Sequence, residues 1–199
     1  MIAGPASPDT LLAHSLTGSN LATPIKVASV GLAVALTAAA AQFTMPLPGT
    51  DVPFVFTPMA VMLTGAVLGS RLGALSQMLY LALGAAGFAV FTPDLRLPPG
   101  IARLVGPTGG YLMAYPFAAF LGGWLAERGW DRRYLTSLAA MLAGLAVIYT
   151  GGVMWRLGLL RAFDLTLATS VLPFLGPDIA KAAIAAAVLP GAWKLFGKS

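Results

Sequence analysis

The fold is decided first by residues 25–43, which read IKVASVGLAVALTAAAAQF. A helix of about twenty apolar residues spans the roughly 30 Å of hydrocarbon in a bilayer. This run holds a single charge, Lys26, close to its start. Backbone groups in lipid must be hydrogen-bonded inside the protein, and the run lacks the alternating pattern of a membrane β-strand. The stretch therefore predicts a transmembrane helix.

Five more apolar runs follow, at about residues 54–69, 72–91, 108–126, 134–155 and 178–196. Of the 199 residues, 58% are hydrophobic and 10% are charged, whereas a soluble domain carries about 25% charged residues. We therefore expect an all-α membrane protein, a bundle of six transmembrane helices formed by residues 25–199. Residues 1–24 are polar and mixed, do not resemble a cleaved signal peptide, and are expected to form a loose N-terminal extension.

The connections between the runs differ in length. Residues 45–53 contain three prolines and residues 92–107 contain four, so both segments are predicted to be loops. Residues 156–177 are apolar but interrupted by charges, which favours an amphipathic or re-entrant helix. The turn near Ser70 and the charged segment 127–133 are short. Long loops gathered on one side are typical of a covered binding pocket.

Lys and Arg residues predict the orientation, because they are enriched on the cytoplasmic side of the membrane. One side carries seven of them: Lys26, Arg71, Arg128, Arg132, Arg133, Lys194 and Lys198. The other side carries four: Arg96, Arg103, Arg156 and Arg161. We expect a multi-pass protein of the cell membrane with both termini in the cytoplasm and ordered loops outside. The basic residues are scattered singly, which argues against a nucleic-acid-binding surface.

Asp178 and Lys181 open the last apolar run with the spacing D-x-x-K. On a helix this spacing puts both side chains on one face, about one turn apart. An ionisable residue in the middle of a membrane costs roughly 2.5–3.5 kcal/mol on insertion scales, so such residues are usually functional or paired. The pair is predicted to bind a ligand, and the alternative is that the two residues only pair with each other near the interface.

Two patterns of small residues each allow a structural and a functional interpretation. The motif GPTGGY, residues 106–111, lies where the third loop enters the fourth run. It favours either close approach of a ligand or a helix N-cap at Thr108 with glycines for tight packing. Gly31, Ala35 and Ala39 recur every four residues and form a face on which another helix can lie closely, inside the bundle or on a partner.

Motifs of the common enzyme classes are absent from the sequence. It contains no cysteine and no G-x-S-x-G, H-E-x-x-H or Walker A pattern. We therefore predict no enzymatic activity, no catalytic residue, no metal site and no cofactor. Hydrolysis of ATP, if transport uses it, must occur on another chain.

Several motifs follow one another along the chain: VPF at 52–54, TP at 57–58, LTGAVLGSRLGALSQMLYLALGAAG at 63–87, GPTGGY at 106–111 and the pair Asp178-x-x-Lys181. Together they resemble the BioY family, over about residues 25–194. BioY proteins are the biotin-binding S components of energy-coupling factor (ECF) transporters. The resemblance implies a six-helix bundle that captures biotin with high affinity beneath its extracellular loops. It also implies the partners, a transmembrane coupling subunit and two cytosolic ATPase subunits.

The same resemblance implies which residues bind biotin and which dock on a partner. Asp178 suits the N–H donors of the ureido ring, and Lys181 suits either the ureido carbonyl or the valerate carboxylate. Further contacts are expected from Thr108, Gly109, Gly110, Tyr111, Phe91, Arg96, Phe54 and Tyr115, with Asp94 and Arg103 as additional candidates. The face of Gly31, Ala35 and Ala39 is expected to dock on the coupling subunit.

Three other functions compete with biotin capture. A self-sufficient secondary carrier would use Asp178 as a proton acceptor, and it would need intramembrane charges on more than one helix, whereas the sequence shows one pair. A membrane enzyme would need a nucleophile and a base, and the sequence contains no motif that supplies them. An S component for another vitamin, such as thiamine or riboflavin, would differ only in its pocket contacts.

Overall fold

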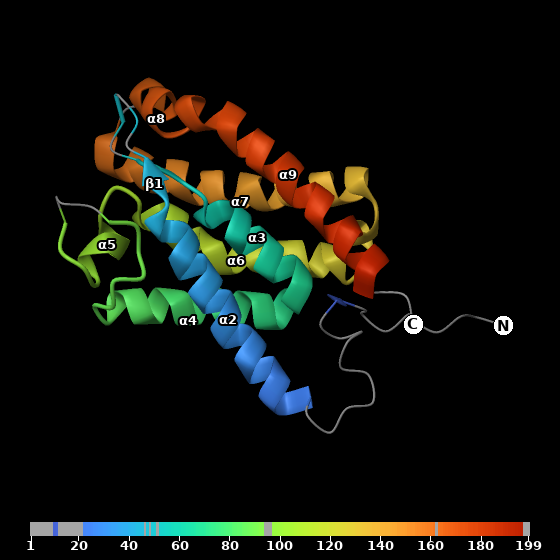
Figure 1. The fold of residues 1–199 in the computed structure, drawn as a ribbon. Helices are drawn as coiled ribbons and strands as arrows, with labels where there is room; N and C mark the ends of the chain where they lie inside the picture. Colours follow the sequence, from blue (N-terminus) through green and yellow to red (C-terminus); the bar gives the residue numbers. More distant parts are fainter. Residues whose placement is uncertain are drawn as a thin grey trace.

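Helices dominate the computed structural model, which describes residues 10–11, 22–45, 47, 49–50, 52–93, 97–161 and 163–196. Within these ranges, six helices have at least 12 residues: α2 (Ala22–Gln42), α3 (Thr57–Leu68), α4 (Ser70–Ala85), α6 (Gly109–Ala126), α7 (Tyr134–Leu160) and α9 (Leu172–Phe196). They run back and forth between two ends of a bundle (Figure 1). The all-α prediction is confirmed. The predicted extension, residues 1–24, lies largely outside the described residues.

Membrane-spanning character is carried by part of the bundle. Among the described residues, three segments are long and apolar enough to cross a membrane: Thr23–Gln42, Tyr134–Leu159 and Thr166–Lys194. Helix α3 is apolar but has 12 residues, and 12 residues at 1.5 Å each reach about 18 Å, less than the roughly 30 Å of hydrocarbon. The chain is thus a membrane protein, while the crossing of all six helices stays a prediction.

The segment 156–177 is organised differently from the expectation of one amphipathic or re-entrant helix. It is divided among the end of α7, the short helix α8 (Phe163–Ser170) and the start of α9. Helix α9 begins at Leu172, so Pro173 is its second residue, where a missing N–H costs no hydrogen bond, and Pro177 lies inside it. Asp178 therefore lies in the second turn of α9 rather than at its start.

The short elements gather at one end of the bundle, here called the loop end (Figure 1). Strands β1 (Thr44–Met45) and β2 (Phe54–Val55) pair antiparallel there, beside α5 (Ala102–Val105) and α8. The opposite end, the turn end, has the tight connections: Gly69 between α3 and α4, and residues 127–133, with the 3-10 helix η1 (Trp130–Arg132), between α6 and α7. This arrangement agrees with the predicted distribution of long and short loops.

Helix α6 packs against α3, α4 and α7 through small residues. Gly65 of α3 lies so close to the backbone of Ala119 in α6 that a Cβ atom would overlap it, which is typical of helix packing in membranes. Polar contacts link two further helix pairs, because the buried Gln77 of α4 donates hydrogen bonds to Thr37 of α2 (3.2 Å) and to Thr64 of α3 (3.3 Å). The bundle around the site is thus held by close backbone approach and by buried hydrogen bonds.

Helix α2 packs on the bundle with one side only. Val34 and Thr37 are buried against it, whereas Gly31, Ala35 and Ala39 are exposed. Its N-terminal half projects away from the other helices (Figure 1). The predicted face of small residues is therefore not used for packing within the described part of the chain.

Candidate ligand-binding site

A cavity of about 390 Å³ lies at the loop end. Its walls come from the β1–β2 segment, the loop after α4, and helices α3, α5, α6, α7, α8 and α9. Small-molecule sites in proteins usually enclose about 300–1,000 Å³. The prediction that long loops cover a pocket on one side of the bundle therefore agrees with the position of this cavity.

Asp178 and Lys181 lie together in the wall that α9 contributes. They form an ion pair with each other, and their exposed fractions are 8% and 6%. Lys181 Nζ also donates a hydrogen bond to the carbonyl oxygen of Val55 in β2, at 2.6 Å, and lies 4.0 Å from the centroid of the Phe54 ring. The two residues pair with each other and also line the cavity, so ligand binding by this pair stays a prediction.

Tyr149 of α7 is a site residue that the sequence analysis missed. Its hydroxyl donates a hydrogen bond to Asp178 Oδ2 at 2.7 Å, and its side chain lines the cavity. A hydroxyl within a long apolar run needs a partner in lipid, and this signal marks Tyr149 as one of several hydroxyl residues in the fifth run, next to Thr150. Its partner cannot be found in the same way, because 29 residues separate Tyr149 from Asp178.

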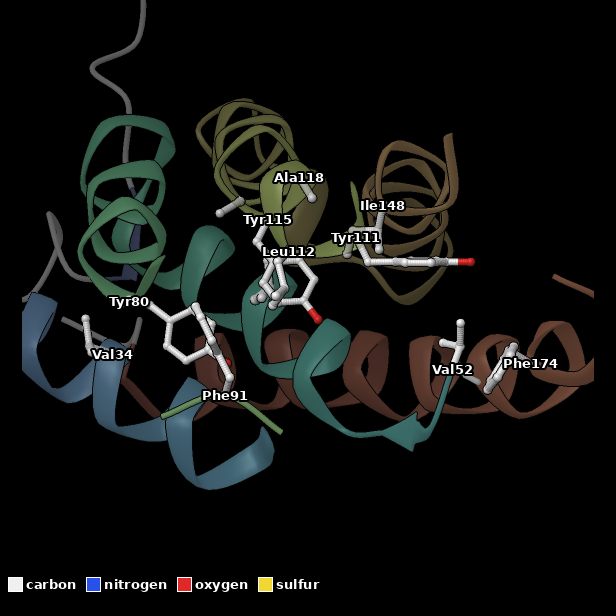
Figure 2. Packing of buried hydrophobic residues seen from close by; sticks show 12 residues of the cluster. Val34, Val52, Tyr80, Phe91, Tyr111, Leu112, Tyr115, Ala118, Ile148 and Phe174 are labelled. Carbon is white, nitrogen blue, oxygen red and sulfur yellow. The ribbon is translucent and has the colours of Figure 1, made fainter. Parts of the chain in front are cut away.

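Aromatic side chains form much of the remaining wall and the core behind it (Figure 2). The rings of Tyr80 and Phe91 meet edge to face with centroids 5.3 Å apart, and the ring of Tyr115 stacks 6.4 Å from Tyr80. The Tyr111 hydroxyl donates a hydrogen bond to the carbonyl oxygen of Ser170, at 2.7 Å, and so joins α6 to the end of α8. Phe91, Tyr111 and Tyr115 line the cavity, and their contact with a ligand stays a prediction.

Most aliphatic lining residues had no distinguishing signal in the sequence; the exception is Val52, which belongs to the VPF motif next to a predicted loop. An apolar residue inside an apolar run looks the same whether it faces lipid, a neighbouring helix or a cavity. The residues of this kind that line the cavity are Val52, Val55, Leu112 and Ile148.

The residues of the GPTGGY motif have different surroundings, some at the cavity and some in helix packing. Thr108 lines the cavity, but Gly109 and Gly110 do not. A Cβ atom on Gly109 would overlap the carbonyl of Leu104, and one on Gly110 would overlap Trp155 and the backbone of Gly151. The two glycines thus allow α6 to lie tightly against α7 and against α5, as the packing interpretation predicts.

The remaining predicted residues are placed as follows. Phe54 is not in the cavity wall but lies behind it, beneath the Lys181 ammonium. Arg103 of α5 lines the cavity and donates hydrogen bonds to the carbonyl oxygens of Thr92 (3.3 Å) and Pro98 (3.1 Å). Arg96 and Asp94 lie outside the described residues. Ligand binding by any of these side chains stays a prediction.

The chemistry of the lining favours a ligand with two different polar ends. Asp178 and Lys181 neutralise each other, so the pair adds no net charge and offers acceptors and donors side by side. A neutral cyclic urea or amide matches that pattern. Arg103 brings a positive charge to a different part of the wall, and guanidinium groups bind carboxylates well. An apolar ligand with a neutral polar ring and one acid group would use all of these features.

Known proteins are similar in sequence to this chain over most of its length. The chain is 44% identical over 160 residues to a probable biotin transporter BioY of Pyrococcus horikoshii, covering 80% of this chain and 91% of that protein. It is 34% identical to the biotin transporter BioY of Thermotoga maritima, covering 79% of this chain and 89% of the relative.

The fold has a counterpart among solved structures. The crystal structure of the S-component for biotin from an ECF-type ABC transporter matches with a TM-score of 0.79 at 24% identity, and the match covers 88% of this chain and 94% of that one. The model of the BioY family matches residues 14–198. On the family match and the 44% identical relative, this chain belongs to the BioY family.

Proposed function

We propose that this chain captures biotin from the extracellular side, as the S component of an ECF vitamin-uptake transporter. The observation that supports this most directly is the buried Asp178–Lys181 pair, joined by the Tyr149 hydroxyl, in the wall of an otherwise largely apolar cavity. Biotin has a neutral ureido ring, an apolar thioether ring and an aliphatic chain that ends in a carboxylate. These parts correspond to the two polar regions and the apolar lining of the cavity.

The charges of the site favour one orientation of biotin. Asp178 carries about four lone-pair positions, and after Lys181 and Tyr149 are counted it still has acceptor capacity for ureido N–H groups. Lys181 has three N–H donors, of which one meets Asp178 and one meets the carbonyl of Val55, so a third remains for the ureido oxygen.

The valerate carboxylate belongs elsewhere in this arrangement. At the neutral pair it would add a net buried negative charge, which is costly in a low-dielectric site. Arg103 lines the cavity and offers a compensating charge. We therefore assign the ureido ring to Asp178 and Lys181, and the carboxylate to Arg103.

The same proposal covers topology and partners. All six long helices cross the membrane, with both termini cytoplasmic and the cavity under the extracellular loops. The exposed face of Gly31, Ala35 and Ala39 on α2 docks on the transmembrane coupling subunit, and two cytosolic ATPase subunits supply energy. What supports this docking role is that small side chains remain exposed on a helix that otherwise packs on the bundle.

Equilibrium binding to the purified protein in detergent tests the proposal. We expect saturable, stoichiometric biotin binding at nanomolar concentration, and much weaker binding of thiamine and riboflavin. Tight binding of another vitamin would reassign the substrate. Failure of a folded, monodisperse sample to bind biotin would overturn the proposed function.

The methyl ester of biotin tests the assigned orientation. Esterification removes the carboxylate charge, so Arg103→Gln should weaken binding of biotin while leaving binding of the ester nearly unchanged. Equal losses for both ligands would show that Arg103 does not meet the carboxylate.

A further inference from the structure

The connection between α6 and α7, at the turn end, exposes its basic residues and turns its acidic residues inward. Arg128, Arg132 and Arg133 are exposed. Of the acidic residues of the same connection, Glu127 is partly buried and Asp131 is fully buried. The exposed charged side chains of this segment are therefore mostly positive.

Each acidic side chain has an internal partner. Glu127 Oε1 accepts hydrogen bonds from the backbone N–H (2.7 Å) and the hydroxyl (2.8 Å) of Ser70, and so caps the start of α4. Asp131 Oδ2 accepts a hydrogen bond from the indole N–H of Trp193 in α9, at 2.5 Å. These carboxylates join neighbouring helices, and the buried Asp131 also attracts the adjacent Arg132.

Two of the arginines are held in place by indole rings. The guanidinium carbon of Arg128 lies 3.4 Å from the centroid of the Trp124 ring, and Arg128 also donates to the carbonyl oxygen of Trp124 at 2.8 Å. The guanidinium of Arg132 lies 4.8 Å from the centroid of the Trp193 ring. A planar guanidinium can stack on a ring and still offer N–H groups at its edge to a phosphate.

The residues around this cluster are of the kinds found at the level of lipid headgroups. Three of the four tryptophans of the chain, Trp124, Trp130 and Trp193, lie at the turn end. Next to the arginines, Tyr134 and Leu135 are exposed, Leu135 to 76%. Tryptophan and tyrosine are enriched where a membrane protein passes from hydrocarbon to headgroups.

We propose that Arg128, Arg132 and Arg133 form a binding surface for the phosphate groups of anionic phospholipids, opposite the cavity. Apolar side chains beside the arginines favour a lipid over a free phosphate ion, because they suit the boundary between headgroups and acyl chains. The cytoplasmic leaflet carries the anionic lipids that attract such basic groups. The inference rests on the orientation given under the proposed function, with the turn end cytoplasmic, and not on the ligand in the cavity.

Quenching of tryptophan fluorescence by brominated lipids measures this binding. The protein is reconstituted in vesicles that contain either brominated phosphatidylglycerol or brominated phosphatidylcholine. We expect wild-type protein to bind phosphatidylglycerol about fivefold more strongly than phosphatidylcholine at low salt, with a smaller preference at high salt. Absence of any preference in the wild-type protein would overturn the proposal.

Substitutions of the arginines test whether the preference for phosphatidylglycerol comes from this surface. The triple variant Arg128→Gln, Arg132→Gln, Arg133→Gln should lose most of the preference while retaining biotin binding, which reports on its fold. If the triple variant does not fold, the single variant Arg133→Gln decides, since no ring contact holds Arg133 in the described structure. Arg133 and Arg161 flank opposite ends of α7 and both are exposed, so Arg161→Gln is the matched control and should leave the preference unchanged.

Two results would contradict the surface as a lipid site. A preference that survives in Arg133→Gln and falls in Arg161→Gln would place the lipid at the other end of the bundle. A preference that millimolar inorganic phosphate abolishes would identify an ion site instead.

Discussion

The hydroxyl of Tyr149 in α7 donates a hydrogen bond to the Asp178 carboxylate in α9, at 2.7 Å. On its other side Asp178 is paired with Lys181, which donates in turn to the carbonyl of Val55 in β2. A chain of polar contacts therefore links two long helices and the loop segment that covers them. This linkage makes the polar end of the cavity sensitive to single substitutions.

Asp178→Asn should weaken biotin binding at least tenfold, which corresponds to about 1.4 kcal/mol. The amide has one acceptor oxygen in place of a carboxylate, and it leaves the buried Lys181 charge without compensation. Isothermal titration with biotin measures the loss, and circular dichroism checks that the helical fold is kept. An unchanged dissociation constant would remove Asp178 from the site.

Tyr149→Phe should weaken biotin binding roughly three- to tenfold, less than Asp178→Asn does. The lost hydrogen bond orients the carboxylate and does not itself meet biotin, so the loss is close to the value of about 0.5–1.5 kcal/mol for an ordinary hydrogen bond. The aromatic ring stays in the wall, so the shape of the cavity is preserved. Tyr134→Phe, at an exposed position of the turn end, is the control and should bind as the wild type does. The assignment of Tyr149 fails if the two variants bind biotin equally well.

Ala35→Trp should leave biotin binding intact and block assembly with the coupling subunit. Ala35 is exposed on α2, so the bulky ring does not disturb the bundle but prevents close approach of a partner helix. Co-purification with the coupling subunit measures assembly, and Ala35→Ser, which keeps a small side chain, should assemble normally. Normal assembly of the tryptophan variant would mean that the partner docks elsewhere.

Gly110→Ala should destabilise the bundle, by about 1–3 kcal/mol, because the added methyl group overlaps Trp155 and the backbone of Gly151. Gly122→Ala in the same helix is the matched control. Its Cβ would meet Met62 at an ordinary 3.7 Å, and alanine is the better helix former. Thermal unfolding in detergent should show a lower midpoint for the first variant and no loss for the second.

Asp131 should make the stability of the turn end depend on pH. Burial raises the pKa of this carboxyl above its ordinary value of 3.8, against the opposing effect of the Trp193 hydrogen bond. The folded state therefore holds the proton more tightly than the unfolded state, and the contribution of Asp131 is greatest below pH 3.8 and is lost as the pH rises through the folded-state pKa.

Asp131→Asn removes this titration. The difference in unfolding midpoint between wild-type protein and Asp131→Asn should shift in favour of the variant as the pH is raised from acid to neutral. A difference that stays constant over that range would show that Asp131 does not titrate differently in the folded state.

Hydropathy and proline placement determine the number of long helices and the end at which the loops gather. A run of apolar residues is a local property, because each residue contributes its own transfer free energy to insertion into lipid. The boundaries near residues 156–177 were harder to predict, since Pro173 and Pro177 look like helix breakers but lie within α9. Pro173 is tolerated because the second position of a helix needs no N–H donor. At Pro177, neighbouring groups can hydrogen-bond the backbone carbonyl that loses its partner.

For the site, the sequence by itself determined that Asp178 and Lys181 share a helix face, since their spacing is fixed by helix geometry. Only the tertiary structure decided that Tyr149 and Val55 complete this polar group, and that Gly109 and Gly110 pack helices and do not line the cavity. The physical reason is distance along the chain. Contacts such as Lys181 with Val55, 126 residues apart, depend on how whole helices pack, and no local pattern of residues records that.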